Sequence, residues 1–279
     1  MKTLMLAVCG VCLLGVSEGA VEPTARGAAS PRLVSQWKGK KTAFLGDSIT
    51  DKAHVGTTAN YWNYLADILG VDAYVYGENG RMTDRMVPQA ERVLADLGDD
   101  VDAIFLLTGT NDYNCGIRLG EWFKLQDEEV VDHGKKVTKP RRIFSMDTFT
   151  FRGRLNLALK FLKAKFPRQQ IVLLTPLHRG FARFGGANTT NVQPEETFCN
   201  GAGLHIDDYV RVVREAGEVW SVPVIDLYAE SGLFPIEPTH AMYFHDGETD
   251  RLHPNAAGHR RIAETMAYKL LAMPSDFKF

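Results

Sequence analysis

Short apolar runs alternate with longer segments of helical periodicity along most of the chain. Each short run is apolar at successive positions, which is typical of a strand buried on both faces of a parallel sheet. The longer segments repeat their apolar residues with the period of a helix that buries one face. The predicted strands are residues 42–45, 73–76, 103–107, 171–174 and 222–227, and the predicted helices are residues 60–69, 87–97, 151–166, 206–219 and 256–271.

Strands that alternate with helices predict an α/β protein, in which each helix crosses over between two parallel strands. The runs above predict one five-stranded parallel sheet flanked by helices. Residues 113–147 interrupt the alternation with a long, charge-rich stretch. We interpret this stretch as an inserted loop rather than another domain, and we expect it to form a wall of the cleft.

The first residues of the chain have the pattern of a secretory signal peptide. Lys2 supplies the positive start, residues 4–16 are largely apolar, and Ser17 and Gly19 form a small-residue exit. The apolar stretch is shorter than the ~20 residues of a membrane-spanning helix, so residues 1–20 are expected to be cleaved rather than to anchor the chain. Cys9 is disfavoured as a lipidation site because too few apolar residues precede it. We therefore expect a secreted protein, extracellular or periplasmic, with a lead-in at residues 21–39 and one domain at residues 40–279.

Charge and cysteine content narrow the possible partners. The formal net charge is -2, which provides no electrostatic footprint for nucleic acid. No segment after the signal approaches the length and apolarity of a membrane span, so no stable membrane insertion is expected once the signal is removed. Only Cys115 and Cys199 would then remain, which makes a single disulfide possible in an oxidising compartment.

Small and polar residues gather directly after the predicted strands. In an open parallel sheet, ligands bind outside the carboxyl ends of the strands, so catalytic groups are expected there. The segments read GDSIT from residue 46, GENG from residue 77, TGTND from residue 108 and TPLHR from residue 175. They predict a functional site at this edge of the sheet.

Ser48 is the candidate nucleophile of this site. Gly46 permits a tight turn after the first predicted strand, and such a turn presents a serine hydroxyl at the sheet edge. A serine in this position is also a common helix cap or turn residue. The catalytic interpretation therefore requires a base, because the hydroxyl must lose its proton as the oxygen attacks, and imidazole has the matching pKa.

His253 is the histidine best placed in sequence to be that base. Asp250 precedes it, Pro254 fixes the backbone after it, and the last predicted helix follows. Asp250 could accept the proton of the ring nitrogen that faces away from Ser48, fixing the tautomer and stabilising the imidazolium. The alternative is that these residues only build a turn and cap the helix.

Taken together, these segments resemble the sequence blocks of the SGNH (GDSL-like) hydrolase family, in the family's order. The matching segments are GDSIT at residues 46–50, Gly80, GTND at residues 109–112 and DRLHP at residues 250–254. The resemblance covers residues from about 40 to 271 and implies a three-layer, flavodoxin-like sandwich. It also implies Ser48 as nucleophile, His253 as base and Asp250 as the partner of His253.

The same resemblance implies an oxyanion hole built from the backbone N–H groups of Ser48 and Gly80 and the side-chain amide of Asn111. Such donors meet the negative charge that develops on the carbonyl oxygen during attack on an ester. Gly77 competes with Gly80 for this assignment, and Gly80 is preferred because it follows Asn79. Considered singly, Asn111 also fits a turn residue and Gly80 a position of positive φ.

Further side chains near these segments are candidates for substrate contact. Aromatic rings can stack on sugar faces, although core packing also accounts for single rings. His240, His245 and Asp246 lie close in sequence, but their spacing matches no zinc pattern. A serine nucleophile needs no metal, so no metal and no other cofactor is predicted. The candidate substrate contacts are Asp47, Asp112, Trp122, His178 and Tyr243, and the aromatic residues considered with them are Tyr61, Trp62 and Phe244.

The expected activity is ester hydrolysis through an acyl-enzyme formed on Ser48. Export and the resemblance favour removal of O-acetyl groups from a polysaccharide or oligosaccharide, as in rhamnogalacturonan acetylesterases, over other small esters. A lysophospholipase or thioesterase of the same fold is the enzymatic alternative, although no segment after the signal has a sequence pattern that indicates a groove for an acyl chain. A glycan-binding protein that has lost catalysis is the alternative from another class.

Overall fold

The computed structural model describes residues 35–186, 188–274 and 277. The predicted signal peptide and most of the predicted lead-in lie outside the described residues. All helices and strands of the described residues belong to the compact unit Ser35–Phe279. None of the helices in the described part of the chain is long and apolar enough to cross a membrane.

A five-stranded parallel sheet forms the centre of the fold, as predicted. Its strand order is β2-β1-β3-β6-β9, the order of a doubly wound, flavodoxin-like sheet. The last strand is shorter than predicted because Pro223 has no N–H to donate and Asp226 already caps the next helix. The bounds are β1 (Lys41–Leu45), β2 (Asp72–Val75), β3 (Ala103–Leu107), β6 (Gln170–Leu174) and β9 (Val224–Ile225).

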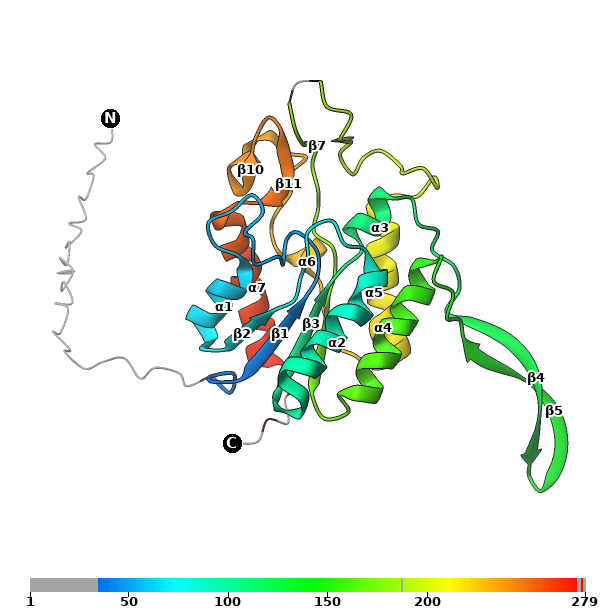
Figure 1. Ribbon diagram of the computed structural model, residues 1–279. Helices are drawn as coiled ribbons and strands as arrows, with labels where there is room; N and C mark the ends of the chain where they lie inside the picture. Colours follow the sequence, from blue (N-terminus) through cyan, green and yellow to red (C-terminus); the bar gives the residue numbers. More distant parts are fainter. Residues whose placement is uncertain (1–34, 187, 275–276, 278–279) are drawn as a thin grey trace, which may run out of the picture. The chain divides into compact units, whose positions relative to one another are not determined.

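Helices cover both faces of this sheet and complete three layers (Figure 1). On one face lie α1 (Tyr61–Leu69) and α7 (Ala256–Ala272), and on the other lie α2 (Met86–Leu97), α4 (Phe151–Lys165) and α5 (Ile206–Trp220). A hydrophobic core lies on each face of the sheet, and successive residues of β1 point into the two cores alternately. Ala43 and Leu45 pack with α2, α4 and α5, while Phe44 packs with α1 and α7. This alternation follows from the period of two along a strand. It confirms the predicted α/β sandwich.

A small second sheet lies beyond the carboxyl ends of the central strands. It has the order β10-β11-β7-β8, and Figure 1 shows β7, β10 and β11 together above the central sheet. The sequence did not predict it, because its strands are short and its two local pairs are joined only by the pairing of β11 with β7, which lie far apart in the chain. The bounds are β7 (Ala182–Arg183), β8 (Val192–Gln193), β10 (Phe244–Asp246) and β11 (Asp250–Pro254).

Short helical segments lie in the loops between the main elements. The most important for the site is α3, because it follows β3 directly and contains Asn111. The segments are η1 (Thr83–Arg85), η2 (Gly98–Asp100), α3 (Thr110–Asn114), α6 (Leu227–Glu230) and η3 (Pro238–Tyr243).

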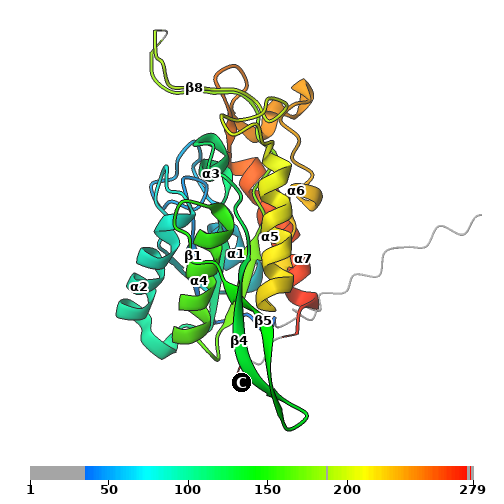
Figure 2. The same ribbon diagram turned by 90° about the vertical axis from the view of Figure 1, so that its right-hand side faces the viewer.

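The prediction of a loop at residues 113–147 is wrong for most of this stretch, which forms an antiparallel hairpin. β4 (Phe123–Asp132) and β5 (Lys135–Phe144) pair along their whole length. His133 and Gly134 take positive φ angles of 49° and 78°, the turn that suits the twist of a two-stranded hairpin. The hairpin extends away from the body, toward the end opposite β7, β8 and β10 (Figures 1 and 2). The hairpin therefore does not line the carboxyl ends of the central strands, where the sequence analysis expected it to form a wall of the cleft.

Candidate active site

Ser48 lies in a turn that begins directly after β1 and is held by buried contacts. The side chain of Gln89 accepts from Gly46 N and donates to Gly46 O, each at 2.8 Å. A Cβ at Gly46 would come within 2.3 Å of the Thr50 hydroxyl oxygen, so only glycine fits this close approach. Ser48 is 6% exposed. The turn therefore has one defined backbone path that presents the Ser48 hydroxyl.

The side chains of Ser48, His253 and Asp250, called the triad here, form a continuous chain of hydrogen bonds. His253 Nε2 lies 2.9 Å from Ser48 Oγ, and His253 Nδ1 lies 2.9 Å from Asp250 Oδ2. The carboxylate can only accept, so Nδ1 carries the proton and Nε2 is left to accept from the serine hydroxyl. This is the geometry that lets a histidine act as a general base toward a serine.

Asp250 is held in its ionised form by its neighbours. Its Oδ1 accepts from the backbone N–H groups of Leu252 and His253 at 3.1 and 3.0 Å. Burial raises the pKa of the Asp250 carboxyl, but the hydrogen bond and charge of His253 and these backbone donors outweigh burial and lower it below the ordinary value. A negative Asp250 can then stabilise a positive charge on the imidazole.

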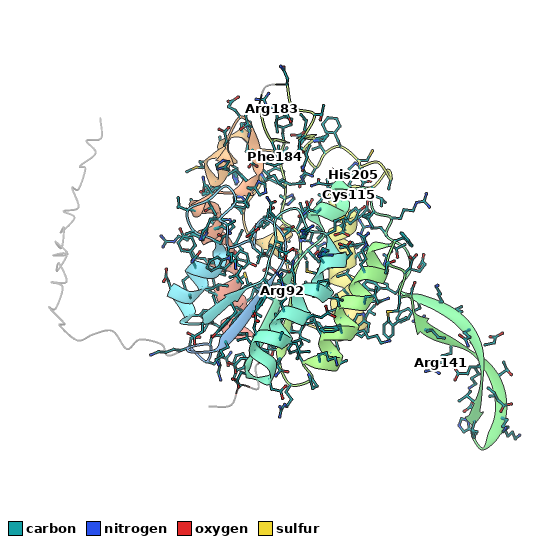
Figure 3. The ribbon with its side chains drawn as sticks, viewed as in Figure 1. Arg92, Cys115, Arg141, Arg183, Phe184 and His205 are labelled. Carbon is teal, nitrogen blue, oxygen red and sulfur yellow. The ribbon has the colours of Figure 1, made fainter. Side chains whose placement is uncertain are left out.

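Two residues that the sequence analysis missed, Phe184 and Gly56, lie next to His253. The Phe184 ring lies with its centroid 5.4 Å from that of His253, and Figure 3 labels Phe184 beside β7. A Cβ at Gly56 would lie 2.9 Å from His253 Cβ and 3.0 Å from His245 Cβ. His245 Nδ1 donates to Gly56 O at 3.0 Å. The loop at Gly56 is therefore packed tightly against the base, and Gly56 adopts a φ of +74°, which favours glycine.

Gly80 and Asn111, the two predicted oxyanion donors besides Ser48, differ in their surroundings. Gly80 has a φ of +72°, and no atom lies within 4 Å of the place where its Cβ would be. Asn111 Nδ2 donates to Arg81 O at 3.0 Å and lies 3.4 Å from Asp47 Oδ2, which ties α3 to both the Gly80 loop and the Ser48 turn. Gly77 differs, because its Cβ would meet Thr50 Cβ at 2.7 Å. Gly77 is thus packed against the Ser48 turn, whereas Gly80 borders open space.

Asp47 and Asp112 are buried beneath the site rather than open to a ligand. Asp47 is 2% exposed and accepts from Ile49 N at 3.1 Å, and burial raises its pKa to about 6. Asp112 is fully buried and pairs with Arg154 at 2.8 Å. Its other oxygen accepts from the backbone N and the hydroxyl of Thr83. Their carboxylates brace the turns that carry Ser48, Thr83 and Asn111, and their role as substrate contacts stays a prediction.

The structure does not join the other candidate contacts to the triad by any hydrogen bond or ring contact among the described residues. His178 Nδ1 lies 2.6 Å from Glu196 Oε1, and its ring stacks on Tyr228. Tyr243 accepts a hydrogen bond from Arg261. Trp122 is the clearest correction: it lies at the base of the hairpin and donates to Glu215. The position of a residue near the end of a strand could not predict which way its side chain points.

In the part of the chain that the structure describes, no group of three or more His, Cys, Asp and Glu side chains is placed to hold a metal ion. His240 Nδ1 accepts from Phe234 N at 3.2 Å, which gives that ring a local structural role. Cys115 and Cys199 are both exposed free thiols in this structure.

A hollow of about 550 Å³ borders the loop that packs against His253. Its lining is small or polar, with two histidines at its walls. The lining residues are His54, Gly56, Thr57, Thr58, His245, Asn255, Ala256 and Ala257.

The fold and the triad define a class of α/β hydrolases with a serine, histidine and aspartate at the carboxyl ends of a parallel sheet. A model of the GDSL-like Lipase/Acylhydrolase family matches residues 44–261, so this chain belongs to that family. The family shows that the protein is an ester hydrolase in the broad sense. No curated protein sequence matches the chain.

Solved structures share this fold across most of the chain. A protein from Lactobacillus plantarum is 26% identical with a TM-score of 0.65, covering 85% of this chain and 99% of its own. A possible lipase from Chitinophaga pinensis is 19% identical with a TM-score of 0.61, covering 84% and 99%. A catalytic mutant of an acetylxylan esterase from Geobacillus stearothermophilus is 18% identical with a TM-score of 0.50, covering 85% and 96%.

Proposed function

We propose that this protein is a serine esterase that removes O-acetyl groups from a polysaccharide or oligosaccharide. The observation that carries the proposal is the unbroken chain of hydrogen bonds from Ser48 through His253 to Asp250, with both bonds to the imidazole at 2.9 Å. A hydroxyl, a base and an orienting carboxylate at these distances are the requirement for nucleophilic attack by serine.

In the proposed reaction, Ser48 Oγ attacks the ester carbonyl as its proton passes to His253 Nε2. Asp250 stabilises the imidazolium that forms. The N–H groups of Ser48 and Gly80 and the amide of Asn111 would meet the charge on the carbonyl oxygen. His253 then returns the proton to the leaving alcohol, and water hydrolyses the acyl-enzyme by the same route in reverse. No cofactor enters this sequence.

The preference for a short acyl group rests on the sequence, in which no segment after the predicted signal provides the long apolar groove or amphipathic surface that a long acyl chain would need. We therefore prefer an acetylesterase to a lysophospholipase or thioesterase. The acetylxylan esterase named above shares the fold, but acetylxylan is the substrate of that protein and is not assigned to this chain. We further propose export of the chain, on the signal-like pattern of residues 1–20.

Acetate release tests the proposal directly. The mature protein would be incubated with acetylated xylan, acetylated pectin and p-nitrophenyl acetate, beside a Ser48→Ala variant. Thr197→Ala is a matched control, because it removes an exposed hydroxyl with only a local contact to Glu195. We expect wild type and Thr197→Ala to release acetate and Ser48→Ala to lose nearly all release. Equal release by Ser48→Ala would refute the serine mechanism, and release from p-nitrophenyl acetate alone would refute the polysaccharide substrate.

A further inference from the structure

Asp47 places its two carboxylate oxygens against two different parts of the site. It precedes Ser48 directly and is 2% exposed. Its Oδ1 accepts from Ile49 N at 3.1 Å, within the turn that carries Ser48. Its Oδ2 lies 3.4 Å from Nδ2 of Asn111, which belongs to α3. One buried carboxylate therefore connects the turn of the nucleophile to the side chain that is expected to donate to the oxyanion.

The acceptors around Asn111 determine which end of its amide faces Asp47. Its Nδ2 donates to Arg81 O at 3.0 Å as well as facing Asp47 Oδ2. A backbone carbonyl and an ionised carboxylate can only accept, so the amide oxygen cannot take the place of Nδ2 without losing both contacts. The amide is therefore held with its N–H₂ group, rather than its oxygen, toward Asp47.

Asp47 can orient this amide only in its ionised form. A proton on Oδ2 would turn the acceptor that faces Asn111 into a donor, and a proton on Oδ1 would do the same toward Ile49 N. Burial raises the pKa of Asp47 to about 6, although the Ile49 N–H opposes the rise. The carboxyl group therefore takes up a proton within the pH range in which an esterase can be assayed.

Titratable groups from β11, α3 and α1 surround Asp47. The charge of His253 on β11 lowers the pKa of Asp47, and the charge of Asp112 on α3 raises it. Burial and the charge of Asp47 raise the pKa of Tyr61 on α1, whose hydroxyl lies 3.0 Å from Thr50 Oγ1. The Tyr61 hydroxyl is therefore neutral when Asp47 changes its charge, and His253 and Asp112 are the neighbours that influence the change.

We propose that Asp47 is a positioning residue, which promotes catalysis by holding the Asn111 amide in the orientation that donates to the oxyanion. The 3.4 Å contact is long for an N–H···O bond, so the amide hydrogen can be shared with the developing negative charge. Because the amide is already oriented, no reorganisation is needed at that moment. The imidazolium of His253 forms in the same step and balances the charge of Asp47. This inference rests on the proposed esterase function and requires no contact between Asp47 and the substrate.

A double-mutant cycle tests whether Asp47 acts through Asn111. Asp47→Asn preserves the shape but replaces one of the two acceptor oxygens with an N–H₂ donor, so it cannot serve Ile49 N and Asn111 together. With p-nitrophenyl acetate it should lower kcat about 10- to 100-fold and leave KM nearly unchanged. In an Asn111→Ala background the same change should alter kcat less than about threefold. Asp127→Asn, at an exposed position of β4, is the matched control and should leave kcat unchanged.

The pH dependence of kcat supplies a readout that a purely structural role would not change. Protonation of His253 removes the base, which accounts for a fall of about one unit in log kcat per pH unit. Protonation of Asp47 adds a second step, so the wild-type fall below about pH 6 should be steeper than this. The fall should be no steeper than one unit in Asp47→Asn and in Asn111→Ala. The comparison of wild type with Asn111→Ala decides the matter if Asp47→Asn does not fold.

Two outcomes would overturn the role of Asp47 and leave the esterase intact. One is an equal loss of kcat from Asp47→Asn with and without Asn111. The other is a pH profile of Asn111→Ala that runs parallel to that of wild type below about pH 6. Failure of the esterase function has a different signature, because Ser48→Ala would then hydrolyse p-nitrophenyl acetate as fast as wild type.

Discussion

Replacing Arg154 with methionine is expected to leave Asp112 as a buried carboxylate without its counter-charge. Asp112 is fully buried, and its Oδ1 accepts from Arg154 at 2.8 Å. Its Oδ2 accepts from Thr83 N at 2.9 Å and from the Thr83 hydroxyl at 2.8 Å. Breaking one side of a buried ion pair costs about 3–5 kcal/mol. Because the two Thr83 bonds remain, we expect the lower end, about 3 kcal/mol of unfolding free energy.

The double variant Asp112→Asn with Arg154→Met should regain part of that loss. Asparagine keeps an oxygen that can accept from Thr83 N, and no buried charge remains, so we expect it to be about 1–2 kcal/mol more stable than Arg154→Met alone. Urea unfolding of wild type, both single variants and the double variant measures this cycle. A double variant less stable than Arg154→Met, or an Arg154→Met variant within about 0.5 kcal/mol of wild type, would refute the reasoning.

The pH dependence of Arg154→Met provides an independent check. Burial raises the pKa of Asp112, while hydrogen bonds from Thr83 and Arg154 oppose the rise. Without Arg154 the pKa of the folded state rises further, so the folded protein binds a proton that the unfolded chain releases. Stability then falls as pH rises through that pKa. The deficit of Arg154→Met relative to wild type should therefore be larger at about pH 8 than at about pH 5.

Other predictions concern the chemistry of the triad. Asn111→Ala should lower kcat for p-nitrophenyl acetate about 10²- to 10³-fold with little change in thermal unfolding, and an unchanged kcat would remove it from the oxyanion hole. Gly56→Ala places a methyl 2.9 Å from His253 Cβ and should lower kcat about 10- to 100-fold, whereas Gly39→Ala, with a similar φ and no atom within 4 Å, should not. Asp250→Asn should lower kcat by about 10⁴-fold while the fold persists, and full activity would exclude it as the partner of the base.

The periodicity of the chain predicted the central fold because that fold is built from its strongest apolar patterns. β3 (Ala103–Leu107) has the predicted bounds, and α4 and α7 differ from theirs by a single residue at one end. The meeting of Ser48 with His253 could also be anticipated. Parallel strands place their carboxyl ends at one edge, and the segment with Asp250 and His253 matched a family block. The described structure brings all three side chains together.

What the sequence could not provide was the direction of individual side chains and the pairing of short strands. Asp112 follows a strand just as Asn111 does, yet one helical step turns it into the core. Trp122 is an aromatic residue near a predicted loop, but its indole donates to Glu215 at the hairpin base. Phe184 reaches His253 only because Ala182 pairs with Asp250, a contact between segments far apart in the chain.

The β4–β5 hairpin offers an attachment point that is mechanically separate from the triad. Cross-strand ion pairs join Glu128 to Arg141 and Glu129 to Lys136, and charges of this kind discourage other strands from adding to its open edges. At its base Phe144 stacks on Trp220, with ring centroids 4.3 Å apart, and Trp122 donates to Glu215. The turn at His133 is exposed and distant from the sheet edge that bears Ser48. A linker or an immobilising tag inserted there would tether the enzyme to a support and leave its working edge facing the solution.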